Sequence, residues 1–198
     1  MCCGISNFMG LEVSQGVTSV LRFTKTDLFV VNDAVEMAEE LTGNAYKMSF
    51  AERSQQRYDV RTVADLAPEE IIEGPFAQII RYEGRKAETS LGSSSYDFYK
   101  ICLQDHNILS ALSQSSTLRL FPFALYIVCH ELIHVVRFTK FLQGFEASVE
   151  EKLQEESRVH EITRNILKGT QVQGLEHVFA FYAAWEGYLD EVREVKAQ

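Results

Sequence analysis

The residues with the clearest chemical potential lie in the stretch 118–145, which contains the motif His130-Glu131-Leu132-Ile133-His134. On a helix, residues four apart are separated by about 40°, so both imidazoles leave one face a single turn apart. Two neutral imidazole nitrogens at this spacing can bind one metal ion. The glutamate between them can then take a proton from a metal-activated water. The motif predicts His130 and His134 as metal ligands and Glu131 as the catalytic base.

The helix that must carry this motif is expected at about residues 119–142, and it is apolar on nearly every side. A helix of this kind is buried. Its polar residues form a narrow strip, with His134 at about 40° from His130, Arg137 at about −20° and Glu131 at about 100°. Burying these groups is costly without partners, and a metal ion would satisfy several of them together. The alternative is a structural hydrogen-bond network in which His130, Glu131 and Arg137 pair with one another.

A third ligand is expected from the next helix, at about 148–168. Its apolar face is centred on Glu156, and His160 lies at about 40° from that residue, also within the face. A short turn containing Gly144 should make the two helices pack antiparallel and bring their polar strips together. Glu156 is therefore the predicted third ligand. His160 is either a fourth ligand or a group that orients one.

Other roles remain open for several of these residues. Glu156 could instead form an ion pair with Arg137 or Arg158. Asp105 falls on the apolar face of a helix expected at about 96–113, where it could be a buried carboxylate that orients a ligand. Arg137 and Asp105 therefore join His160 as candidates for a fourth ligand or a supporting group.

Taken together, these residues resemble the gluzincins, a group of zincin-type zinc metallopeptidases. The chain has the HExxH motif on a buried helix and a glutamate 22 residues after His134 on a following helix. The resemblance covers about residues 119–168 and implies zinc bound by His130, His134 and Glu156, with Glu131 as general base. It also implies a peptide or protein substrate. The chain departs from the group at His160, where gluzincins commonly carry an aspartate.

Gluzincins also have an upstream sheet whose edge strand holds the peptide substrate. The strands expected at 58–63 and 76–82 could serve in this way, although the helix expected at 96–113 intervenes before the motif. This second departure, like the first, concerns peptidase activity more than metal binding.

Two other functions fit the same residues. Glu131 and His134 form an ExxH pair, as in ferritin-like carboxylate sites, and Glu156 with His160 could bind a second ion. A helical non-haem iron or di-metal protein is therefore an alternative, with Fe in place of zinc, although the chain has no second ExxH. The other alternative is a catalytically inactive zincin-like module that binds a protein partner through its acidic surface.

Composition narrows the class of protein. The chain has 198 residues, with 28 acidic and 19 basic side chains and a net charge of −9, so nucleic acid is not an expected partner. Its four cysteines form no C-x-x-C pair or spaced framework, which favours a reducing compartment and a cytoplasmic location. The apolar run at 121–129 ends where His130 begins the motif, so this run is too short for a transmembrane segment.

The expected fold class is α+β, mainly α, in a single domain over residues 1–198. A helical C-terminal half carries the HExxH helix, and a small N-terminal α/β portion contains a short antiparallel sheet. A polar loop is expected at 83–95. The remaining elements are expected as strands at 17–23, 58–63 and 76–82 and as helices at about 26–41, 96–113, 119–142, 148–168 and 174–195.

Overall fold

The computed structural model describes residues 20–54, 58–85, 95–144 and 148–183. It is a mainly helical α+β structure with a small sheet in the N-terminal half, which confirms the predicted fold class. The elements are α1 (Lys25–Ala45), α2 (Phe50–Ser54), β1 (Tyr58–Arg61), β2 (Ala77–Arg85), β3 (Ser95–Leu103), α3 (Asp105–Gln114), α4 (Leu120–Thr139) and α5 (Val149–Lys168), with short 3-10 turns at Val63–Asp65 and Pro68–Glu70.

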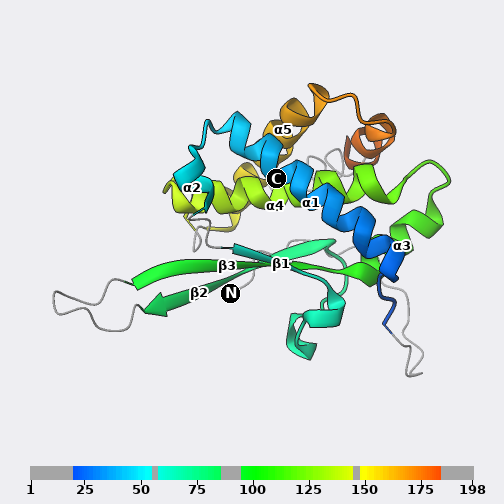
Figure 1. Ribbon diagram of the computed structural model, residues 1–198, viewed down its shortest axis with the longest axis horizontal. Helices are drawn as coiled ribbons and strands as arrows, with labels where there is room; N and C mark the ends of the chain where they lie inside the picture. The colour runs from blue at the N-terminus through cyan, green and yellow to red at the C-terminus, as the bar shows by residue number, and fades with distance from the viewer. Residues whose placement is uncertain (1–19, 55–57, 86–94, 145–147, 184–198) are drawn as a thin grey trace, which may run out of the picture.

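The elements are arranged in layers, with α4 in the middle (Figure 1). Helices α1 and α4 lie over one face of the sheet, and α5 packs on α4. Apolar side chains of the sheet, such as Ile79 and Ile101, join Phe123 and Leu125 of α4 in one hydrophobic core. The helix that carries the HExxH motif is thus held by the sheet, by α1 and by α5.

Helix α4 is buried around its whole circumference, as its apolar sequence predicts. Every side chain from Pro122 to His130 is buried, and so are those from Leu132 to Phe138. By length and composition alone α4 could also cross a membrane, but 83% of its most apolar window is covered by the rest of the protein. That is the environment of a central core helix.

Helix α5 begins at a capping box formed by Ser148 and Glu151. The Ser148 side chain accepts from the Glu151 amide at 3.3 Å, and the Glu151 carboxylate accepts from the Ser148 amide at 2.8 Å. Along the contact between α4 and α5, residue numbers rise on α4 as they fall on α5, from Tyr126–His160 to Arg137–Glu155. The two helices are therefore antiparallel, as expected from the short turn between them.

The prediction of one helix at 96–113 is wrong over its first half. Residues 95–103 form β3, and α3 begins only at Asp105. The β3 strand is the central one, with β1 on one side and β2 on the other, and its Tyr99 and Ile101 are almost fully buried. Aromatic and β-branched residues such as these suit a buried strand, and pairing along both edges outweighs their helix-like spacing.

The sheet differs in one detail from the expected antiparallel arrangement. β2 pairs antiparallel with β3, with Ala77 opposite Leu103, but β1 pairs parallel with β3, with Tyr58 opposite Tyr99. The strands predicted at 58–63 and 76–82 correspond to β1 and β2, with β3 between them. The loop predicted at 83–95 is wrong at both ends, because β2 continues to Arg85 and β3 begins at Ser95. Residues 20–23 do not form the strand predicted at 17–23.

Parts of three predictions lie outside the described residues. They are positions 17–19 of the first strand, positions 86–94 of the polar loop and positions 184–195 of the last helix. The described part of that helix runs from Leu175 to residue 183.

Candidate metal centre

The polar strips of α4 and α5 meet at His130, His134 and Glu156. The Nε2 atoms of the two histidines lie 3.1 Å apart. Glu156 reaches both, with Oε1 at 2.9 Å from Nε2 of His130 and Oε2 at 3.4 Å from Nε2 of His134. One ligand atom from each of the three residues lies within 4.8 Å of the others, as a site for a single metal ion requires. The structure therefore brings together the three residues predicted as ligands.

The donor set of this cluster fits a transition metal. Zinc in catalytic sites commonly takes two imidazoles and a carboxylate, which leaves one position for water. Both histidines are buried, with 6% and 4% of their surfaces exposed, while the Glu156 side chain keeps 24% of its surface exposed. The three side chains would hold the ion in a largely dry site that solvent can still reach from the side of Glu156.

Glu131 lies beside the cluster and is only partly buried. Its carboxylate is close enough to His130, His134 and Glu156 to interact with their charges. Burial raises the pKa of Glu131, while the two histidines act in the opposite direction. Among the described residues, none forms a hydrogen bond or an ion pair with this carboxylate, so it is free to accept a proton.

The ring of His134 is oriented by Gln143, which lies just beyond the end of α4. Nδ1 of His134 lies 3.1 Å from Oε1 of Gln143. An amide oxygen only accepts, so Nδ1 carries the hydrogen and donates it. This bond directs Nε2 of His134 at the cluster, the arrangement that orients metal-binding histidines in proteins. Nδ1 of His130 is buried without a hydrogen-bond partner among the described residues, so Nε2 is its only polar contact there.

His160 lies next to the three predicted ligands on α5. Its Nε2 lies 3.6 Å from Oε1 of Glu156, and its ring centroid is 4.3 Å from that of His130. Its Nδ1 lies 2.9 Å from the hydroxyl of Tyr126, which is fully buried on α4. His160 thus contacts the cluster, but it is not one of the three residues whose ligand atoms converge.

The charges within the cluster are strongly coupled. Burial disfavours a charge on Glu156, but His130 and His134 outweigh it and hold the pKa of this carboxyl well below its usual range. Burial also disfavours a charge on His134, but Glu156 outweighs it and raises the pKa of His134 to about 9. Burial and the nearby charge of His130 lower the pKa of His160 to about 2. The cluster therefore holds an anionic carboxylate that attracts positive charge, and His160 stays neutral.

Arg137 contacts Glu155 rather than the cluster. Its Nε donates to Oε1 of Glu155, and the arginine also bonds to Tyr46, the C-cap of α1. Glu155 pairs in addition with Arg158 at 3.6 Å. The ion pair considered for Glu156 is thus formed by the neighbouring glutamate, which leaves Glu156 to the histidines. Arg137 supports the packing of α4 on α5 one turn from the site.

The described hydrogen bonds of Asp105 lie away from the cluster. This residue is the first of α3, and its carboxylate accepts from the backbone amides of Phe23 at 2.9 Å and Val63 at 3.1 Å. The proposed role depended on a continuous helix over 96–113, and β3 removes that helix. Asp105 instead ties the segment before α1 and the turn after β1 to the start of α3.

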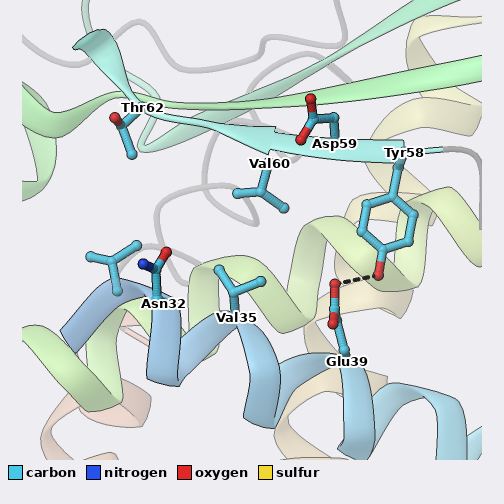
Figure 2. A pocket seen from close by; sticks show the side chains of 8 residues that line it. Asn32, Val35, Glu39, Tyr58, Asp59, Val60 and Thr62 are labelled. Carbon is cyan, nitrogen blue, oxygen red and sulfur yellow. Dashed lines mark hydrogen bonds between the residues drawn. The ribbon is translucent and has the colours of Figure 1, made fainter. Parts of the chain in front are cut away.

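A separate hollow of about 220 Å³ lies between α1 and β1 (Figure 2). Its apolar lining comes from Val31, Val35 and Val60. At one end the Tyr58 hydroxyl donates to Oε1 of Glu39 at 2.8 Å. Its lining includes none of the cluster residues, and its two polar groups at that end already bind each other.

Comparisons with known proteins add no assignment. No protein-family model, curated protein or solved structure matches this chain. The geometry of the cluster is therefore the basis for inferring the protein's function.

Two side chains near the cluster, Tyr126 and Gln143, are not among the residues predicted from the sequence. Tyr126 stands four residues before His130, so helical spacing places it on the same strip of α4, and this could have identified it. Gln143 lies outside the regular helix, where spacing gives no information about which side chain it meets. The tyrosine was recognisable from the sequence, and the glutamine was not.

Proposed function

We propose that this protein is a zinc-dependent metallohydrolase of the gluzincin-like type, acting on peptide bonds. The observation that carries the proposal is the convergence of His130, His134 and Glu156 from two antiparallel helices, with the carboxylate of Glu131 beside them. The order of these residues in the chain is that of the gluzincins. The packing of the motif helix against β2 and β3 is a further point in its favour.

In this proposal His130, His134 and Glu156 would hold a zinc ion, which when bound would supply a Lewis acid that lets water react near neutral pH. Glu131 accepts the proton of the attacking water and passes it to the leaving amine. Gln143 keeps the His134 ring in its binding orientation. The buried apolar side chains of α4 exclude bulk water from one side of the site.

The test is the substitution Glu131→Gln, which keeps the shape of the side chain and removes its ability to take a proton. Hydrolysis of fluorogenic peptides by the zinc-loaded protein should fall by about 10²–10⁴-fold, the usual contribution of a general base. Zinc content should remain that of the wild type, because Glu131 is not a ligand. The control is Glu161→Gln, the same change at an exposed position of α5.

The proposal is overturned if Glu131→Gln leaves peptide turnover intact while the wild type and the Glu161→Gln control are active. It is also overturned if the wild type binds zinc but hydrolyses none of the peptides. That second result would favour the inactive binding module.

A second candidate is a non-haem iron protein, because two histidines and one carboxylate also form the usual iron-binding triad. Elemental analysis separates the two metals. One zinc per chain supports the hydrolase, and iron in the purified protein supports the alternative. A di-metal site is less well supported, because the described residues contain one converging group of ligands.

A further inference from the structure

A buried pair, Tyr126 and His160, connects α4 to the carboxylate of Glu156. Tyr126 stands one turn before His130 on α4, and His160 stands one turn after Glu156 on α5. The tyrosine hydroxyl lies 2.9 Å from Nδ1 of His160, and the opposite nitrogen, Nε2, lies 3.6 Å from Oε1 of Glu156. Tyr126 is 0% exposed and His160 is 3% exposed, so water does not compete for these contacts.

The carboxylate determines where His160 carries its hydrogen. If Nε2 lacked a hydrogen, its lone pair would face the negative charge of Glu156, which is unfavourable. If Nε2 carries the hydrogen, it points at the carboxylate, and Nδ1 of the neutral ring can accept from the Tyr126 hydroxyl. A doubly protonated ring would also direct an N–H at Glu156. In each arrangement that suits the carboxylate, Nε2 carries a hydrogen that points at Glu156, and His160 lies outside the group of described residues whose ligand atoms converge.

Packing fixes the tyrosine ring independently of its hydroxyl. The ring of Tyr126 stacks on that of Tyr182, with centroids 4.2 Å apart and planes 18° apart. Tyr182 in turn lies 5.2 Å from the ring of His160. The hydroxyl can therefore be removed without removing the contacts that hold the ring, which makes its contribution measurable by itself.

We propose that Tyr126 and His160 are positioning residues that orient Glu156 from outside the ligand set. This inference rests on the proposed function, because it assumes that Glu156 binds the metal. It resolves the two roles considered for His160, since the histidine then donates toward the ligand and does not bind the ion. A bound metal would then have three protein ligands and an open position, as in catalytic zinc sites, whereas a fourth protein ligand would give the closed set of a structural site.

The first test is Tyr126→Phe, which removes one hydroxyl and keeps the ring. Zinc affinity, measured by competition with a chelating dye, should fall by about tenfold, within the range for groups that orient a ligand. The matched control is Tyr58→Phe, which removes a hydroxyl bonded at 2.8 Å to Glu39, a carboxylate outside the cluster. That control should bind zinc as the wild type does. Equal zinc affinity for Tyr126→Phe and wild type would overturn the proposal.

The second test replaces His160 and uses Co²⁺ as a visible probe of coordination. In His160→Gln the amide keeps an N–H that can reach Glu156 but loses the bond to Tyr126. Its Co²⁺ complex should keep the band positions and intensities of the wild type, with affinity about 10–100-fold lower. A change in those bands to a pattern of different coordination number would show that His160 is a ligand and would overturn the proposal.

The readouts also separate this inference from the function on which it rests. If the wild type binds neither Zn²⁺ nor Co²⁺, the proposed function fails and the inference fails with it. If the wild type binds both but Tyr126→Phe has no effect or His160→Gln changes the Co²⁺ bands, only the inference fails. Thermal unfolding of each variant without metal identifies any loss of folding, and Tyr126→Phe decides the question if His160→Gln is unstable.

Discussion

Glu70 and Glu156 lie in two regions of the described structure that differ in how a carboxylate away from solvent is satisfied. Against the sheet, Glu70 receives donors on both carboxylate oxygens. Lys100 Nζ lies 2.8 Å from Oε1 and 2.6 Å from Oε2, and the Tyr82 hydroxyl lies 2.9 Å from Oε1. Between α4 and α5, the Nε2 atoms of His130 and His134 instead face each other and the same carboxylate of Glu156.

This difference separates a structural polar contact from a candidate functional one. At Glu70 a fixed cation, Lys100, already supplies the positive charge that the carboxylate needs. At Glu156 the groups that converge are mainly electron-pair donors, and a proton on His134 supplies the positive charge. A divalent cation could take the place of that proton, which the lysine at the other region does not permit. The Glu70 region should therefore respond to loss of its lysine, whereas the Glu156 region should respond to added metal.

The largest expected effect is on folding stability, from Lys100→Met. The substitution leaves the Glu70 carboxylate, whose side chain is 8% exposed, without its cation. Breaking a buried pair in this way should lower the free energy of unfolding by about 3 kcal/mol, measured by urea denaturation. Zinc affinity should not change, because Lys100 and the cluster share no contact.

The control for this prediction is Arg61→Met, which breaks an exposed pair with Asp59 whose side chains are 46% and 39% exposed. An exposed pair contributes about 1 kcal/mol or less, so this variant should remain close to the wild type. Equal losses of stability in the two variants would show that the buried pair of Lys100 and Glu70 stabilises the fold no more than an exposed pair does.

A smaller effect on the free energy of unfolding is expected when the pH is lowered. Hydrogen bonding from Lys100 lowers the pKa of Glu70 below its ordinary value of 4.5. Since the folded state holds this proton more weakly than the unfolded state, the stabilisation is present above pH 4.5 and is lost as the pH falls through the folded pKa. Urea denaturation at decreasing pH should show this loss. In Lys100→Met the dependence between pH 4.5 and lower values should be flatter, and an unchanged slope would contradict the assignment.

Much of the candidate site could be predicted from the sequence because both of its helices are strongly periodic. Spacing alone placed His130, His134, Glu156 and His160 on buried strips, and the antiparallel packing of α4 and α5 brings these strips together. A polar side chain at the centre of an apolar helical face is informative, since burial without a partner is costly.

The rest could not be predicted, for reasons that differ from residue to residue. The apolar residues of β3 suit either a helix or a strand by spacing, and pairing with β1 and β2 decides between them. Asp105 is therefore buried as predicted, but at the first position of α3 and not inside a helix over 96–113. The choice of Arg137 between Glu155 and Glu156 depends on the rotation of α5 by a fraction of a turn, which helical periodicity does not determine.

The central claim is that His130, His134 and Glu156 form a metal site, and zinc titration of the purified protein tests it most directly. Wild type and Glu156→Ala, each first stripped of metal by a chelator, are titrated with Zn²⁺ by calorimetry and then assayed for bound zinc by elemental analysis. The predicted result is one zinc per chain for the wild type and no tight binding for Glu156→Ala. Equal zinc binding by both proteins, or none by the folded wild type, would contradict the claim.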